Sequence, residues 1–247
     1  MRSINAKLFM GRAFEYRKEK KMKRWGAMAK AFTKIGKEIA IAIKEGGGVP
    51  ETNPRLRLAI QNAKKVNMPK VNVDAAIKRG TSKDSENYDE VVYEGYAMHG
   101  IAVFIEALTD NPTRTVANVR SYFTKTNGKL GTSGSLDSLF TRKSFFRVKK
   151  ENIANIDDLE LEMIDAGLDE YKTDDDEYIF YAAFTDFGLM QKFFEERKIE
   201  VEEAGAERIP TLLKQLDDEK VDDVIKLIDK LDDDDDVINV FHNMDMN

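Results

Sequence analysis

Residues 46–80 read GGGVPETNPRLRLAIQNAKKVNMPKVNVDAAIKRG, and this stretch predicts where the helices of a small bundle end and begin. Gly46-Gly47-Gly48 ends a helix, because glycine readily leaves the right-handed helical conformation. Asn53-Pro54 predicts the start of the next helix, with asparagine as the N-cap and proline at the first helical position. Met68-Pro69 interrupts that helix, and a short third helix follows as far as Gly80.

The segment before this stretch predicts a longer helix with two opposite faces. Apolar residues recur there at steps of three and four, which places them on one side of a helix. These residues are Trp25, Met28, Phe32, Ile35, Ile39 and Ile43. A second set, on the opposite side, consists of Lys23, Lys30, Lys34, Lys37 and Lys44. We therefore expect this lysine face to be exposed to solvent.

Beyond a polar linker at residues 81–90 the pattern changes to strands alternating with helices. Asn111-Pro112 caps a helix, and a glycine-rich loop follows at Gly128–Gly134. Strands are predicted at Val91–Ala97, Ile101–Leu108 and Leu136–Thr141. Near the end of the chain a strand at Arg208–Leu213, a helix from Val221 to Leu231 and a strand at Val237–Phe241 are predicted.

Residues 144–203 also predict strands and helices, and these follow one another in a known order. The predicted strands are Ser144–Lys149, Glu170–Thr173, Tyr178–Phe184 and Ile199–Glu203. The predicted helices lie near Asp157–Ala166 and Phe187–Arg197. The order β-α-β-β-α-β is that of a ferredoxin-like domain.

Together these patterns predict an α+β protein: an N-terminal helical bundle followed by two α/β domains, one of them ferredoxin-like. The expected domains are a basic helical domain at 1–82, a discontinuous α/β domain at 88–141 plus 207–247, and an inserted ferredoxin-like domain at 142–206.

The charge distribution is strongly uneven along the chain. The net charge of −6 hides a segment 1–80 with 20 basic and 6 acidic residues and a segment 81–247 with 19 basic and 39 acidic residues. Such an asymmetry indicates a basic module for a polyanion attached to an acidic body.

Several classes of protein are disfavoured by composition. The chain has no cysteine, so disulfides and thiolate metal sites are excluded. No apolar run approaches the roughly 20 residues that span a bilayer. The opening MRSINAK has neither an apolar core nor a cleavage site of a secretory signal. We expect a cytoplasmic protein with no membrane partner.

Several motifs resemble those of the YebC/PmpR family. MGRAFEYR at residues 10–17 is similar to the Met-Gly-Arg version of its N-terminal signature, and residues 46–80 match its most recognisable segment. Further matches are YEGY at 93–96, LTDNPTRT at 108–115, LGTSGS at 130–135 and the acidic run Asp232–Asp236. The resemblance covers residues 10–243 of the chain. Because residues 1–9 precede it, we expect Met10 to be the native start.

The resemblance implies three domains and a role in gene expression. Members have been described as DNA-binding transcriptional regulators. Others, including the mitochondrial translational activator of cytochrome oxidase, act in translation and help ribosomes through proline-rich sequences.

Catalytic and cofactor sites are weakly indicated. The two histidines, His99 and His242, are far apart in sequence and show no nucleophile–base arrangement. The loop Gly128–Gly134 could approach a phosphate with bare backbone amides, but a loop leading into a strand is the preferred interpretation. The acidic runs Asp174–Asp176 and Asp232–Asp236 lack the ligand spacing of a calcium loop, and we interpret them as solvated turns. We expect no cofactor, no metal, no small-molecule substrate and no enzymatic activity.

The basic residues of the first 80 positions form the candidate site, because lysine and arginine bind phosphates through Coulomb attraction and counterion release. The nucleic-acid-binding residues predicted are Arg12, Arg17, Lys18, Lys20, Lys21, Lys23, Arg24, Lys30, Lys34, Lys37, Lys44, Arg55, Arg57, Lys64, Lys65, Lys70, Lys78 and Arg79. The expected partner is ribosomal RNA or DNA. We expect a ribosome-associated translation factor that relieves stalling at proline-rich sequences. The alternative is a DNA-binding transcriptional regulator, and an enzyme of unknown class is the least favoured.

Overall fold

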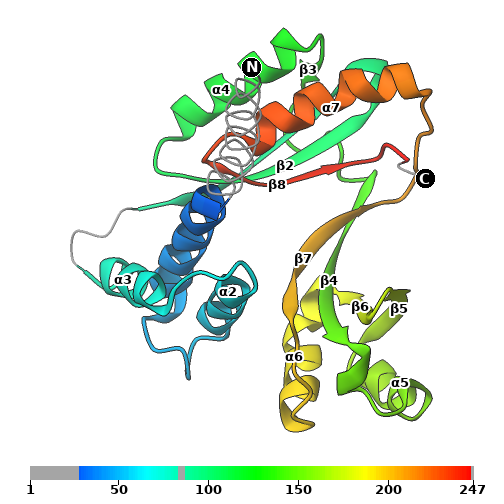
Figure 1. The fold of residues 1–247 in the computed structure, drawn as a ribbon. Coiled ribbons are helices and arrows are strands. Elements are labelled where there is room, and N and C mark those ends of the chain that lie inside the picture. Colours follow the sequence, from blue (N-terminus) through cyan, green and yellow to red (C-terminus); the bar gives the residue numbers. More distant parts are fainter. Residues whose placement is uncertain (1–27, 83–86, 246–247) are drawn as a thin grey trace, which may run out of the picture.

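The structure is a computed structural model, and it describes residues 28–82 and 87–245 (Figure 1). The chain forms a helical segment, a sheet covered by two helices, and a second sheet carried on two long strands, and in sequence the second sheet lies between the first three strands of the first sheet and its last helix and strand. This architecture confirms the predicted α+β class with an N-terminal helical region. The basic run from Arg12 to Arg24 and the expected start at Met10 lie outside the described residues.

The helical segment contains a helix at residues 28–46, α2 (Pro54–Lys65) and α3 (Lys70–Gly80). Asn53 is the N-cap of α2, because its side chain accepts a hydrogen bond from the Leu56 amide at 3.0 Å. The same side chain donates to the Ala42 carbonyl at 2.6 Å, which fastens α2 to the helix at 28–46. The buried core of the segment comprises Ile35, Ile39, Ala42, Ile43, Leu56, Ala59, Ala63, Met68, Val73 and Ala76.

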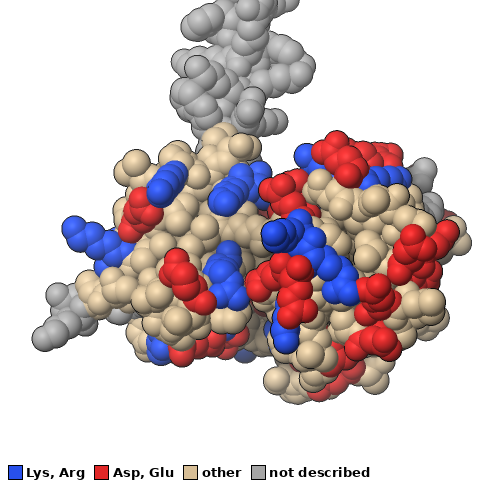
Figure 2. All heavy atoms as spheres, turned by 90° about the horizontal axis from the view of Figure 1, so that it is seen from below, with Lys and Arg blue, Asp and Glu red and all other residues tan. Residues whose placement is uncertain are grey.

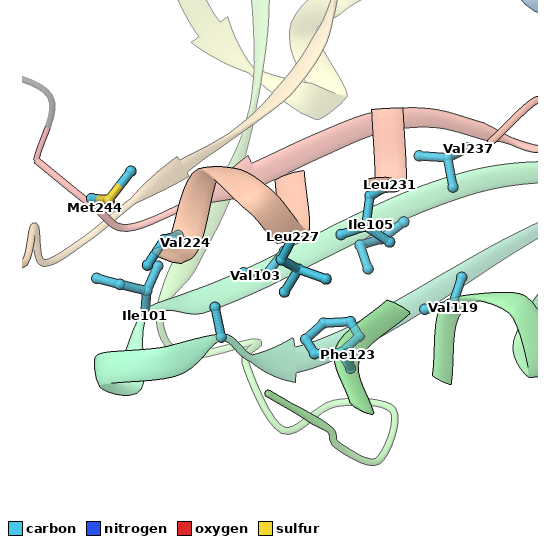
Figure 3. Close-up of a cluster of buried hydrophobic side chains, with 11 residues drawn as sticks. Ile101, Val103, Ile105, Val119, Phe123, Val224, Leu227, Leu231, Val237 and Met244 are labelled. Carbon is cyan, nitrogen blue, oxygen red and sulfur yellow. The ribbon is translucent and has the colours of Figure 1, made fainter. Parts of the chain in front are cut away.

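The first sheet has the strand order β3-β1-β2-β8, with every neighbouring pair antiparallel. Its strands are β1 (Asp89–Tyr96), β2 (Ala102–Thr109), β3 (Lys129–Leu130) and β8 (Val237–His242). Helices α4 (Pro112–Lys125) and α7 (Asp218–Asp232) cover one face (Figure 1). Val103 and Ile105 of β2 meet Phe123 of α4 and Leu227 of α7 in the core between these layers (Figure 3).

The second sheet has the order β5-β6-β4-β7 and is also antiparallel. Its elements are β4 (Phe140–Lys149), α5 (Ile156–Asp165), β5 (Leu168–Asp174), β6 (Glu177–Ala183), α6 (Phe187–Glu196) and β7 (Glu203–Pro210). Short 3-10 helices lie at Met98–Gly100, Lys150–Asn152 and Phe184–Asp186. The chain order and the central position of β4 and β6 confirm the ferredoxin-like prediction.

At two places in the chain, two consecutive strands that were predicted as separate are replaced by one continuous strand. Leu136–Thr141 and Ser144–Lys149 were expected as separate strands, whereas β4 runs unbroken over Phe140–Lys149. The polar residues at 141–143 hide this continuity in the sequence, but they are held by pairing with β7 from Phe140↔Pro210 to Arg147↔Glu203. Likewise β7 replaces the two strands expected at 199–203 and 208–213. The precise domain boundaries stay a prediction.

The described helices include none that is both long and apolar enough to cross a membrane.

Candidate nucleic-acid interface

The middle of the lysine face of the helix at 28–46 is covered by another part of the chain. Lys37 is only 7% exposed. Its ammonium donates to the Asp236 carboxylate at 2.6 Å, to the Asp235 carbonyl at 2.8 Å and to the Leu108 carbonyl at 3.1 Å. The expectation that Lys37 faces solvent is therefore wrong. The first sheet supplies the covering surface, and a helical period cannot reveal it.

The two lysines that precede Lys37 on the same helix face the same acidic segment. Lys30 forms an ion pair with Asp233. Burial lowers the pKa of the half-buried Lys34 ammonium, while the nearby Asp232 opposes this effect. The residues 232–236 thus lie along the face that carries Lys30, Lys34 and Lys37, and we call them the acidic segment.

Asp236 is the centre of this contact and is 5% exposed. Its second carboxylate oxygen accepts hydrogen bonds from Arg114 at 2.7 Å, Thr115 at 2.8 Å and Thr109 at 3.2 Å. Burial alone would raise the pKa of Asp236, but the hydrogen bonds from Arg114, Lys37 and Thr115 outweigh it and lower the pKa to about 2. Asp236 is therefore an ionised residue that joins the helical segment to the first sheet.

Asp234 fixes the conformation of the acidic segment. Its carboxylate accepts hydrogen bonds from the Tyr122 hydroxyl at 2.9 Å and from the Asp236 amide at 2.9 Å. Burial and the bond to Asp234 raise the pKa of Tyr122 to about 12. The interpretation of Asp232–Asp236 as a solvated turn is therefore wrong for Asp234 and Asp236, which are both buried. Across residues 28–82 and 87–245, no group of three His, Cys, Asp or Glu side chains could hold a metal ion.

The sequence motif at residues 108–115 builds this contact. It supplies the Leu108 carbonyl, the hydroxyls of Thr109 and Thr115, and the guanidinium of Arg114. Asn111 caps α4 by accepting from the Arg114 amide at 3.1 Å. These residues were missed as a site. The sequence signal that could have identified them is a set of hydroxyl and guanidinium groups beside a predicted helix start, together with an acidic run elsewhere in the chain.

The glycine-rich loop is also held from inside. Glu94 is 3% exposed, and its carboxylate accepts from the Gly134 amide at 2.7 Å and from the Leu136 amide at 2.6 Å. Its backbone carbonyl accepts from the Gly131 amide at 2.7 Å. Because these amides already bind Glu94, the loop does not present them to a phosphate.

Most basic residues of α2 also have acidic partners. One partner lies at the end of the helix at 28–46, one lies in β1, and the other two lie in α6 and β7. The pairs are Arg55–Glu45, Arg55–Glu90, Arg57–Glu195 and Lys65–Glu203. Arg55, Arg57 and Lys65 therefore help to attach the helical segment to its neighbours.

A second group of predicted residues remains available to a partner. Lys64, Lys70, Lys78 and Arg79 are exposed, and none of them forms an ion pair with a described residue. Lys44 is exposed and donates a hydrogen bond to the Asn87 side chain. We call Lys70, Lys78 and Arg79, which all lie on α3, the α3 cations. Figure 2 shows basic and acidic groups interleaved across one face of the molecule, so that face carries no continuous basic surface.

A cleft of about 420 Å³ lies where the helical segment meets both sheets. Within it Arg208 donates to Glu106 at 3.3 Å. Burial raises the pKa of Glu38 to about 7, while Arg55 and Lys34 oppose this effect. Acidic and basic side chains balance each other in this cleft, so it is a poor candidate for phosphate.

The two histidines have different surroundings. His99 Nε2 is 3.2 Å from the Asp223 carboxylate at the surface of α7. His242 is half-buried, and burial lowers the pKa of its imidazole. Neither is placed beside a serine or threonine hydroxyl by any hydrogen bond among the described residues.

Comparisons with known proteins cover nearly the whole chain. A family model described as "TACO1/YebC protein N-terminal domain" matches residues 12–83, and one described as "TACO1/YebC second and third domain" matches residues 88–244. A protein of Parabacteroides distasonis named "Probable transcriptional regulatory protein" is 55% identical, over 95% of this chain and 97% of its own length. A protein of the same name from Sulfurimonas denitrificans is 49% identical, over 95% and 100%. The crystal structure of a conserved hypothetical protein from Aquifex aeolicus is 37% identical, with a TM-score of 0.76, and the match covers 88% of this chain and 90% of that chain.

Proposed function

Because the chain belongs to the TACO1/YebC family, we propose that it is a nucleic-acid-binding factor of gene expression whose helical segment contacts phosphate. The family membership confirms the resemblance found in the sequence. In its finer form the proposal is a ribosome-associated translation factor that relieves stalling at proline-rich sequences. Its role is to position RNA or a stalled peptidyl-tRNA, with bond-making chemistry left to the ribosome.

The observation that carries this proposal is the exposure of the α3 cations without acidic partners among the described residues. A phosphate that approaches Lys70, Lys78 or Arg79 breaks no ion pair that the structure shows. The full Coulomb and counterion-release gain is then available for binding. By contrast, contact with Lys37 would require the loss of its bonds to the acidic segment.

The second sheet favours a factor that docks through one end. On the face of this sheet away from α5 and α6, Lys143 pairs with Glu170 at 3.1 Å and Arg147 pairs with Glu203 at 3.3 Å. Tyr181 on the same face is only 6% exposed, so it offers no ring on which a base could stack. A neutralised face of this kind gives little attraction to bare nucleic acid, which supports docking by the helical segment alone.

The second candidate is a DNA-binding transcriptional regulator. It is favoured by the name of the relatives, "Probable transcriptional regulatory protein". Phosphate contacts alone carry no sequence information, and the α3 cations are suited to phosphate. For this reason the translational proposal is preferred.

The test uses a deletion strain analysed by ribosome profiling and RNA sequencing in parallel. We expect ribosomes to accumulate at consecutive prolines without a change in the corresponding mRNA levels. Wild-type protein should restore normal occupancy, and the variant Lys70→Glu/Lys78→Glu/Arg79→Glu should not. In vitro, the same variant should lose up to about three units of salt-dependence slope, one per phosphate contact.

The matched control is Arg120→Glu/Lys125→Glu/Lys129→Glu, which makes the same change of charge at exposed positions of α4 and β3. It should rescue as wild type does. If both triple variants fail equally, the effect is one of net charge and the helical segment is not the interface. If mRNA levels change at promoters that the purified protein binds, and occupancy at prolines does not, the transcriptional alternative is correct.

A further inference from the structure

A groove of about 430 Å³ separates the helix at 28–46 from α3. This size lies within the range of small-ligand sites, which is about 300–1,000 Å³. Both helices contribute small side chains and polar groups to it, and Tyr88 from the segment before β1 is also part of its lining. The lining residues are Phe32, Thr33, Gly36, Lys37, Ala40, Met68, Asn72, Ala75, Ala76, Arg79, Gly80, Ser82 and Tyr88.

The two helices approach each other closely beside Gly80. A Cβ placed on Gly80 of α3 would lie 2.7 Å from Ile43 Cδ1 and 3.5 Å from Ala40 Cα, so the backbones approach closely there. One turn away from Ala40, a Cβ placed on Gly36 would have no described atom within 4 Å apart from its chain neighbours and the backbone of its own helix. The space beside Gly36 is therefore open, whereas α3 lies against the backbone at Ala40.

Gly36 keeps this space open. A glycine in the middle of a helix is less stable there than alanine. Neither a positive φ nor close packing within the described chain requires glycine at this position, unlike Gly47 with its φ of 81° or Gly80 with its close neighbours. What the missing side chain does preserve is the volume of the groove.

The walls carry the groups that recognise a nucleotide. Phe32 and Tyr88 provide aromatic rings, and the Lys37 ammonium lies 5.5 Å from the centre of the Tyr88 ring, which helps to hold that ring in place. The exposed Asn72 provides an amide that can pair with a base edge. Arg79 lines the groove, is exposed, and provides a guanidinium that can bind a phosphate.

We propose that this groove binds one nucleotide of a single-stranded nucleic acid, with the base inserted between the helices and its phosphate at Arg79. The inference rests on the proposed function and deepens it. In this proposal the α3 cations are not only a general phosphate-binding surface: they bind the backbone of the strand whose base enters the groove. Stacking in such a site tolerates every base, because each base has a π-face.

The test fills the groove without changing its charge. Gly36→Leu places a side chain in the empty volume, and Gly36→Ala is the matched control that keeps most of it. The probes are a single-stranded RNA of about 12 nucleotides and the DNA of the same sequence, each with one 2-aminopurine. We expect the wild type and Gly36→Ala to bind alike and to change the fluorescence of the 2-aminopurine as it stacks. Gly36→Leu should weaken binding roughly tenfold and abolish the fluorescence change. The RNA and DNA arms show which strand the groove prefers.

The outcomes separate the two proposals. If Gly36→Leu binds like the wild type while the triple variant of the α3 cations binds weakly, the groove is not a nucleotide site and the proposed function stands. If the wild type binds neither strand, the proposed function fails and the groove fails with it. Ala75→Leu fills the groove from an exposed position of α3, and it must reproduce the effect of Gly36→Leu if that variant folds poorly.

Discussion

The helical segment carries lysines of two kinds, and the difference between them is set outside the segment. Lys37 is buried against the first sheet and bound to Asp236, whereas Lys78 is exposed and has no acidic partner among the described residues. Both were predicted from the same basic composition. Net charge therefore identifies a segment that attracts anions but does not identify which of its cations are already occupied.

The opposite charges of the two parts of the chain have an internal use. Five ion pairs connect the described basic segment to the remainder: Lys30–Asp233, Lys37–Asp236, Arg55–Glu90, Arg57–Glu195 and Lys65–Glu203. The charge asymmetry thus contributes to how the parts of the molecule fit together, in addition to any attraction for an external polyanion. Three predictions can sharpen or break this contrast between occupied and available cations.

The largest effect is expected for Lys37→Glu. The substitution removes a buried ion pair and places a carboxylate beside Asp236, so we expect the free energy of unfolding to fall by at least about 3–5 kcal/mol. Urea unfolding at pH 7, followed by circular dichroism, measures the change. Lys37→Met is the control, because it keeps the aliphatic stem and adds no negative charge, and it should cost less. An unchanged unfolding midpoint for Lys37→Glu would show that Lys37 is solvated like Lys78.

A smaller effect, with a characteristic pH dependence, is expected for Asp236→Asn. The pKa of Asp236 is lowered from 3.8 to about 2, so the ionised carboxylate stabilises the fold above about pH 4 and this contribution disappears as the pH falls toward 2. The contribution amounts to about 2 kcal/mol at neutral pH. Unfolding measured between pH 2 and 7 should show a shallower acid loss for Asp236→Asn than for the wild type. Parallel curves would contradict the assignment of Asp236 as the ionised centre.

The smallest effect is expected for Lys30→Ala. Its partner Asp233 has a side chain that is 75% exposed, and exposed ion pairs contribute only about 0–1 kcal/mol. Added salt should remove the difference from the wild type, because screening weakens solvent-exposed pairs. Thermal unfolding at low and high salt measures this. A loss as large as that of Lys37→Glu, unaffected by salt, would mean that the acidic segment protects both lysines equally.

Local sequence rules predicted the elements well where the signal lay within a few residues. Asn53-Pro54 and Asn111-Pro112 each begin a helix, because the asparagine side chain binds an amide three residues later. The order of strands and helices between Phe140 and Pro210 is ferredoxin-like as expected. The unbroken strand β4 was missed because its polar residues 141–143 interrupt the apolar alternation, and only pairing with β7 reveals that the strand continues.

The candidate site was predictable in composition but not in detail. A helical period places Lys37 opposite the apolar face, and without a second layer that position faces water. The layer that buries it comes from the first sheet and from residues near the end of the chain. Likewise Asp236 is predicted as one member of a solvated acidic run, because no residue near it in the sequence identifies Lys37, Arg114 and Thr115 as its partners. Side-chain contacts at such separations depend on the complete fold.

The bond between Lys37 and Asp236 also fixes an order of events during synthesis, because the two residues are 199 positions apart. At an elongation rate of about 5–20 residues per second, Asp236 is added about 10 to 40 s after Lys37. For that interval Lys30, Lys34 and Lys37 belong to a nascent helix whose acidic counterpart does not yet exist. The bonds of Lys30 and Lys37 to the acidic segment are thus confined to the last stage of making the protein, whereas the bond of Lys37 to Leu108 and the pair Arg55–Glu90 need only the strands β1 and β2.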